Sequence, residues 1–102
     1  APSVDIIGML LAEGARVRAY DPAAREVARG LLPAEVEICA DAYEAVRGCD
    51  ALMLLTEWDE FKKLDLARVR RLMTLPVVVD GRNLFDPAEM ARHGFEYRGV
   101  GR

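Results

Sequence analysis

The chain has 102 residues, of which 52% are hydrophobic and 30% are charged, and its net charge is −3 at pH 7. One domain, residues 1–102, is the natural count at this length, with enough hydrophobic side chains for a core. The acidic balance argues against a nucleic-acid partner, and no apolar run approaches the ~20 residues that span a membrane. Without a secretory signal at its start, the sequence predicts a soluble, cytoplasmic protein.

The first half of the chain alternates helix and strand signals. Ser3 is a suitable N-cap for a helix over residues 3–13, with Gly14 in the usual stop position. Asp21 is a second N-cap, for a helix over residues 21–32. Alternating apolar residues predict short strands at residues 16–20 and 36–38.

The second half continues this alternation. Asp41, with Glu44 three residues later, forms a capping box for a short helix that ends at Gly48. Residues 50–55 are the most apolar segment, and we expect a central strand buried on both faces. The remaining predicted elements are a turn at 56–61, a helix at 64–73, a strand at 76–80, a turn at 81–83, a helix from Asp86 to Gly94 and a strand at 95–98.

Alternating helices and strands predict an α/β fold with right-handed crossovers and a mostly parallel sheet. The chain opens with a helix, whereas a doubly wound sheet opens with a strand that normally lies at its centre. We therefore expect a Rossmann-like, three-layer domain that lacks its first, central strand.

Two segments are placed where ligands bind in such folds, outside the carboxyl ends of the strands. They are residues 55–61 and 80–83, which follow the two most apolar strands and should be neighbours at one edge of the sheet. Arg82 leaves its strand on a short tether, and its guanidinium can give two parallel hydrogen bonds to a phosphate or carboxylate. Gly81 before it permits a close approach to a ligand. The bland alternative is an arginine paired with Asp80, Asp86 or a helix end.

The segment after the other strand leaves similar alternatives open. Trp58 is either a plug over the sheet edge, a wall for a sugar or base, or an interdomain contact. Thr56 is either an N-cap or a ligand hydroxyl. The acidic side chains of Glu57, Asp59 and Glu60 are explained by a solvated loop.

The sequence contains none of the common motifs for catalysis or metal binding. His93 is the only histidine, so it has no second histidine to build a metal site with. There is no G-x-G-x-x-G fingerprint and no P-loop. Cys39 and Cys49 have the spacing of neither a redox motif nor a disulfide framework, and we interpret them as small buried hydrophobes.

Five segments, taken in order, carry more information than their spacing does. They are Ala1 to Ile7, Gly14 to Pro22, Ala51 to Phe61 with its Leu-Thr-Glu-Trp core, Val78 to Asn83, and the closing stretch from Gly94 to Arg102. Together they resemble the carboxy-terminal domain of the UDP-glucose/GDP-mannose dehydrogenases. Thr-Glu-Trp, then Asp-Gly-Arg-Asn, then a Gly-x-Gly-Arg ending favour the UDP-glucose branch of that family.

The resemblance implies an NAD-dependent parent enzyme that oxidises UDP-glucose to UDP-glucuronate, with this chain as its UDP-sugar-binding domain. It implies that Arg82 contacts the ligand, and it makes Asp80, Gly81, Asn83, Thr56, Glu57 and Trp58 further substrate-binding candidates. The alternatives are a domain of a GDP-mannose or other nucleotide-sugar dehydrogenase, and an independent Rossmann-like binding or regulatory module.

The amino-terminal NAD-binding domain, the catalytic cysteine and the central pairing helix of that family have no counterpart here. Cys39 and Cys49 match no catalytic position. We therefore expect no catalytic, cofactor-binding or metal-binding residue in this chain, and no dehydrogenase activity from it alone. Its expected partners are a UDP-sugar and the absent domains, in a parent that forms a homo-oligomer.

Overall fold

The computed structural model describes residues 2–22, 30 and 32–100. The chain divides into two compact units, residues 1–45 and residues 46–102. The helix predicted at residues 21–32 falls largely on residues 23–29 and 31, outside the described residues. No helix in the described part of the chain is long and apolar enough to cross a membrane.

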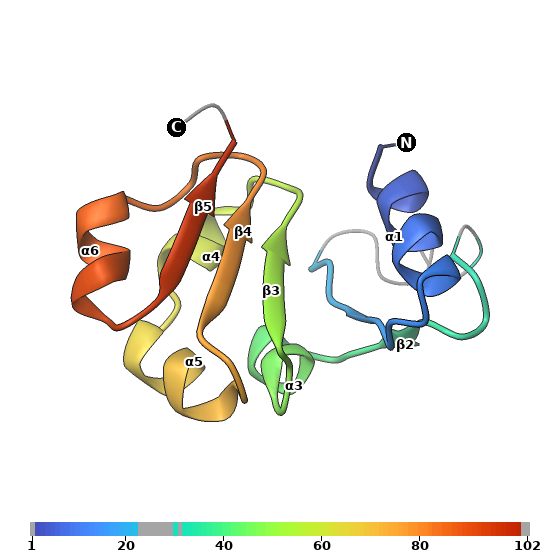
Figure 1. The fold of residues 1–102 in the computed structure, drawn as a ribbon, viewed down its shortest axis with the longest axis horizontal. Helices are drawn as coiled ribbons and strands as arrows, with labels where there is room; N and C mark the ends of the chain where they lie inside the picture. Colours follow the sequence, from blue (N-terminus) through green and yellow to red (C-terminus); the bar gives the residue numbers. More distant parts are fainter. Residues whose placement is uncertain (1, 23–29, 31, 101–102) are drawn as a thin grey trace. The chain divides into compact units, whose positions relative to one another are not determined.

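The first unit combines helices with a short parallel ladder (Figure 1). Its elements are α1 (Pro2–Ala12), β1 (Arg18–Ala19), β2 (Glu37–Ile38) and the start of α3 (Ala42–Val46). β1 and β2 are parallel, with Arg18 opposite Glu37. The amide of Cys39 extends the ladder by donating to the carbonyl of Ala19 at 2.8 Å.

The second unit is a three-stranded parallel sheet, and helices form the connections from one strand to the next (Figure 1). Its elements are β3 (Ala51–Leu54), α4 (Asp59–Lys62), α5 (Leu66–Leu72), β4 (Val77–Asp80), α6 (Pro87–Arg92) and β5 (Glu96–Gly99). The strand order is β3-β4-β5. Leu54, Asp80 and Gly99 stand side by side at the carboxyl ends of the three strands. The predicted α/β class with parallel strands is confirmed.

The core of the second unit lies around β4 and the helices that follow the strands. Its buried side chains include Leu54, Phe61, Leu66, Val69, Met73, Val78, Phe85, Met90 and Phe95. Val78, on the central strand, and Met90, on α6, are completely buried. Burial of such apolar side chains stabilises each by roughly 1.5–3 kcal/mol, and this is what holds the helices against the sheet.

Local capping signals account for most helix boundaries. The amide of Glu44 donates to the carboxylate of Asp41 at 2.8 Å, and the amide of Glu89 donates to that of Asp86 at 3.0 Å. Gly14, Gly48 and Gly94 end their helices with positive φ, as predicted. The predicted cap at Ser3 is wrong. α1 begins one residue earlier, at Pro2, because proline is favoured in the first helical turn and extends the helix past Ser3.

The prediction of one sheet with residues 50–55 at its centre is also wrong in its details. The described strands form two sheets, and β4 rather than β3 is the central strand of the larger one. Ala51 is exposed, Leu52 and Met53 are half-buried, and Leu54 alone of β3 is buried. The apolar run identified a strand, but a strand with one neighbour in its sheet is not buried along its length.

Candidate functional site

The candidate site lies at the carboxyl end of β4, where the chain turns over the end of β3. The amide of Gly81 donates to the carbonyl of Leu54 at 2.8 Å, which ties the turn to the neighbouring strand. A Cβ on Gly81 would lie 3.0 Å from that same carbonyl oxygen, closer than most such contacts, so the close approach favours glycine. The two predicted segments are therefore neighbours at this edge, as expected from the sequence.

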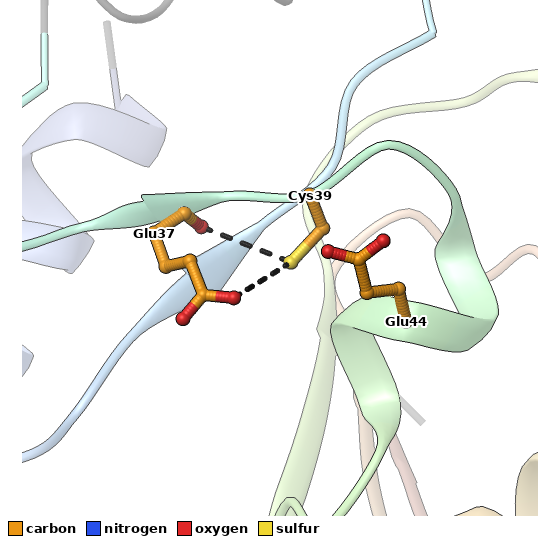
Figure 2. Close-up of side chains that lie close together, drawn as sticks. All are labelled: Glu37, Cys39 and Glu44. Atoms are coloured by element: carbon orange, nitrogen blue, oxygen red, sulfur yellow. Dashed lines mark hydrogen bonds between the residues drawn. The ribbon is translucent and has the colours of Figure 1, made fainter.

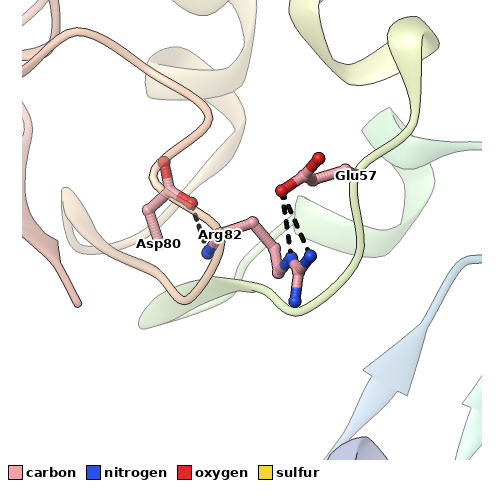
Figure 3. A network of polar contacts seen from close by, with 3 residues as sticks. All are labelled: Glu57, Asp80 and Arg82. Atoms are coloured by element: carbon pink, nitrogen blue, oxygen red, sulfur yellow. Dashed lines mark hydrogen bonds and ion pairs between the residues drawn. The ribbon is translucent and has the colours of Figure 1, made fainter.

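Arg82 makes an ion pair with Glu57, the residue third after the end of β3. Its Nη2 lies 3.2 Å and its Nε lies 3.3 Å from the same carboxylate oxygen, Oε1 of Glu57 (Figure 3). The exposed fractions of the two side chains are 51% and 55%. The guanidinium thus stands at the surface with a carboxylate as its partner, an arrangement that a ligand phosphate can replace.

Asp80 holds the turn from the inside. It is fully buried, at 0% exposure, and its carboxylate accepts hydrogen bonds from the amides of Arg82 and Phe85, each at 3.0 Å. The hydroxyl of Tyr97 donates a third at 2.6 Å. Figure 3 shows the carboxylate of Asp80 bonded to the backbone of Arg82, while the guanidinium points away toward Glu57. The alternative pairing of the Arg82 guanidinium with Asp80 is therefore not what forms.

Asn83 completes the turn in a left-handed conformation. Its φ is 54°, a region that asparagine tolerates better than most residues. Its side-chain amide donates to the carbonyl of Val100 at 2.8 Å, and the amide of Val100 donates to the carbonyl of Asp80 at 3.1 Å. The turn after β4 is thereby bonded to the residues on both sides of it, so its backbone presents Arg82 from a fixed position.

Trp58 lies beside the ion pair in sequence and opens α4. It is half-buried, and its Nε1–H is closed to solvent without an acceptor among the described residues. An unpaired buried donor costs about 1–3 kcal/mol. Because this N–H is closed to solvent, the geometry gives Trp58 no ready ligand contact through it. Thr56, also half-buried, is not the cap of this helix, because Trp58 occupies the N-cap position.

The sequence pattern of the UDP-glucose/GDP-mannose dehydrogenase family, UDP binding domain, matches residues 1–87. The chain belongs to this family. The match includes both strand ends of the candidate site, and therefore all seven candidate substrate-binding residues. Tyr97 lies beyond it.

Relatives within the family include two bacterial enzymes named UDP-glucose 6-dehydrogenase. TuaD of Bacillus subtilis is 45% identical over 102 residues, which is all of this chain and 22% of TuaD. The Pseudomonas aeruginosa protein is 45% identical over 108 residues, again over all of this chain and 24% of that protein. The chain thus spans under a quarter of the length of these relatives.

A solved structure of a dehydrogenase shares the fold of this chain. The NDP-N-acetyl-D-galactosaminuronic acid dehydrogenase of Methanosarcina mazei superposes with a TM-score of 0.80 at 30% identity, over 99% of this chain and 20% of that one. The parallel pairing of β3 and β4 brings the two strand ends to one edge of the sheet, and open parallel sheets bind their ligands at this edge.

A second polar cluster lies in the first unit and was not foreseen from the sequence. One ligand-type atom from each of Glu37, Cys39 and Glu44 lies within 4.8 Å of the others (Figure 2). Burial of the thiol, followed by the charges of Glu37 and Glu44, raises the pKa of Cys39 from 9.0 to about 11. Cys39 donates weakly to the carboxylate of Glu37 at 3.8 Å. Full burial and the raised pKa give this thiol the character of an unreactive, structural cysteine.

Two residues important to the site were missing from the sequence-based set. Tyr97 and Phe85 both bond to the buried carboxylate of Asp80. The available signal was the aspartate itself, because an acid that ends a buried strand needs donors from elsewhere in the fold.

Proposed function

We propose that this chain is the nucleotide-sugar-binding domain of an NAD-dependent dehydrogenase that oxidises UDP-glucose to UDP-glucuronate, and that Arg82 binds the pyrophosphate of the ligand. Membership of the family supports the class of ligand. The names of the bacterial relatives support UDP-glucose as the substrate of the complete protein.

The observation that carries the proposal is the ion pair of Arg82 with Glu57. A guanidinium binds phosphate and carboxylate through the same pair of parallel N–H groups. Because both side chains are about half exposed, the pair contributes at most about 1 kcal/mol. A pyrophosphate can therefore displace Glu57 from Arg82 at little cost in stability, and it gains two charge-assisted hydrogen bonds.

The other candidate residues have graded roles in this proposal. Gly81 and Asn83 shape the turn that carries Arg82, and Asp80 fixes it from beneath. Thr56, Glu57 and Trp58 lie on the facing segment, where ligand binding would move them. Glu57 would leave the arginine, because its charge has the same sign as the phosphate.

We propose that NAD binds to another part of the parent protein. The chain contains no G-x-G-x-x-G, the glycine-rich turn that lets a backbone approach the pyrophosphate of a dinucleotide. In the complete enzyme NAD would accept the hydride, and the residues of this chain would bind and orient the UDP-sugar.

A different nucleotide sugar is the second candidate. It is favoured by the solved neighbour from Methanosarcina mazei, whose name gives an N-acetylated uronic acid nucleotide. Both candidates use the same contact from Arg82 to a pyrophosphate, so they differ only in the sugar.

The test is turnover by the full-length protein whose reading frame contains this sequence. NADH formation is followed with UDP-glucose and with GDP-mannose, and we expect turnover of UDP-glucose alone. Turnover of GDP-mannose alone would reject the proposed sugar. UDP binding without turnover of either sugar would reject dehydrogenation of these substrates in favour of another nucleotide sugar or a binding module.

The role of Arg82 is tested separately by the variants Arg82→Ala and Arg82→Lys. Loss of charge-assisted hydrogen bonds worth about 1.5–3 kcal/mol predicts a roughly 10- to 100-fold weaker affinity for UDP in the alanine variant. Lysine keeps the charge but not the planar fork, so its affinity should fall between those of alanine and arginine. Unchanged affinity in Arg82→Ala would reject the assigned contact.

A further inference from the structure

Tyr97 reaches the candidate site from β5, two strands away from Glu57. It stands opposite Val78 in the parallel ladder of β4 and β5. Because side chains two residues apart on a strand share a face, Asp80 lies on the same face as Val78. Tyr97 and Asp80 are therefore diagonal neighbours, and the phenol hydroxyl bridges the diagonal to Oδ2 of Asp80 at 2.6 Å.

The hydroxyl of Tyr97 also lies 3.0 Å from the carbonyl oxygen of Phe85. A tyrosine hydroxyl has one hydrogen, and the shorter contact, to the carboxylate, receives it. The same carboxylate oxygen accepts the amide of Phe85 at 3.0 Å, whereas the other oxygen accepts the amide of Arg82. Tyr97 thus fixes the orientation of the Asp80 carboxylate about the Cβ–Cγ bond.

The orientation of this carboxylate determines the position of the Arg82 backbone, because the Arg82 amide donates to it. Asp80 is fully buried, so bulk solvent does not compensate for a hydrogen bond lost at its carboxylate. Removing the phenol hydroxyl leaves Oδ2 with the Phe85 amide as its one remaining hydrogen-bond donor among the described residues, and frees the carboxylate to turn. A turned carboxylate lengthens the bond to the amide of Arg82, and the start of the Arg82 side chain moves with it.

We propose that Tyr97 is a positioning residue for Arg82, acting through the buried carboxylate of Asp80 to aim the guanidinium at an anionic ligand. The inference rests on the proposed function, in which Arg82 binds the pyrophosphate of a nucleotide sugar. Tyr97 itself makes no contact with the ligand. It acts only on the backbone from which Arg82 projects.

The competing explanation is that Tyr97 merely stabilises the fold. Both explanations predict a lower melting temperature when the hydroxyl is removed, so stability alone does not separate them. They differ in whether the effect on ligand affinity depends on Arg82, because a residue that acts through Arg82 has nothing to position once that side chain is gone.

The test is a double-mutant cycle in the full-length protein with Tyr97→Phe, Arg82→Ala and both together. UDP dissociation constants are measured by calorimetry, and melting temperatures are measured for the same samples. Tyr43→Phe is the matched control, because it removes a phenol hydroxyl in the first unit. Asp80→Asn provides a second disturbance of the same carboxylate, which should couple to Arg82 in the same way.

We expect Tyr97→Phe to weaken UDP binding about threefold or more in the presence of Arg82 and to have no effect in the Arg82→Ala background. The loss of melting temperature should be equal in both backgrounds. Equal weakening in both backgrounds, or unchanged affinity in the folded single variant, would overturn the positioning role and leave the proposed function intact. Normal UDP affinity in Arg82→Ala would overturn both.

Discussion

The guanidinium of Arg82 meets the carboxylate of Glu57 at 3.2 Å across 25 residues of sequence. The two residues meet because β3 and β4 are adjacent and parallel, with Leu54 opposite Asp80. The segments that follow the two strands therefore leave the sheet at the same level. This pair gives the surface of the domain a cation whose present partner is exchangeable.

Replacing Glu57 with glutamine should strengthen binding of UDP. The variant removes the carboxylate that competes with the ligand for Arg82, and we expect roughly a two- to fivefold gain in affinity from an exposed pair of this kind. Stability should change by less than about 1 kcal/mol. Calorimetry with UDP and thermal melting of the full-length protein measure the two effects.

Glu60→Gln is the control for this charge change. It removes an equal charge from the same acidic segment, in α4, without touching the ion pair. A gain of affinity in both variants would indicate a general electrostatic effect. Weaker binding in Glu57→Gln would contradict competition and would make Glu57 a support for Arg82 instead.

Gly81→Ala should destabilise the protein and weaken UDP binding. Its Cβ would lie 3.0 Å from the carbonyl oxygen of Leu54, which is also the acceptor of the Gly81 amide. β3 and β4 cannot move apart to make room for the Cβ without lengthening that hydrogen bond. We therefore expect a loss of about 1–2 kcal/mol in the free energy of unfolding. Denaturant unfolding measures the loss.

The matched glycine is Gly8, on the exposed side of α1, where a Cβ meets nothing within 4 Å. Gly8→Ala should stabilise the protein by about 0.5–1 kcal/mol, because alanine is the better helix former. Equal effects of the two substitutions would show that the contact with Leu54 does not constrain the turn.

Asp80→Asn should be far more damaging than Asp86→Asn, although the chemical change is the same. The buried carboxylate of Asp80 accepts two amides and a hydroxyl, and an amide group in its place would turn a donor toward one of these donors. We expect a loss of about 2–4 kcal/mol. Asp86 is an exposed N-cap, for which asparagine is as good, so its loss should stay within about 0.5 kcal/mol. Similar losses in the two variants would contradict the role of Asp80.

The stability of the fold should fall at alkaline pH because of Cys39. Its pKa is raised to about 11 in the folded protein, first by burial and then by Glu37 and Glu44. The folded protein therefore keeps a proton that the unfolded chain loses near pH 9. The contribution of the neutral thiol is complete below pH 9 and is lost as the pH rises toward 11.

Denaturant unfolding between pH 8 and 11 measures this loss. In Cys39→Ala, the part of the pH dependence of the free energy of unfolding that is due to the thiol should disappear. A thiol reagent should also modify the half-buried Cys49 before the fully buried Cys39 in the folded protein. Rapid modification of Cys39 under native conditions would contradict its burial.

Features that depend on a few consecutive residues were predictable from the sequence. The caps at Asp41 and Asp86 and the glycine stops at Gly14 and Gly94 were identified correctly, because each involves residues within one helical turn. The position of β3 at the edge of its sheet was not predictable. The apolar composition of a segment indicates that the strand is buried, but it does not indicate how many strands lie beside it.

The site divides in the same way. The sequence placed Glu57 and Arg82 at one edge, since both follow apolar strands, but it did not pair them. The bond from Tyr97 to Asp80 was beyond reach, because it depends on the register of β5 against β4. A shift of one residue in that register would turn the phenol to the opposite face.

The hydrogen bond from the amide of Gly81 to the carbonyl of Leu54 joins the start of the turn that carries Arg82 to the end of β3. Any opening that exposes this amide to solvent also releases the turn that carries Arg82. Deuterium uptake at Gly81 should therefore slow when UDP binds, reporting ligand occupancy from a backbone position that the ligand need not touch.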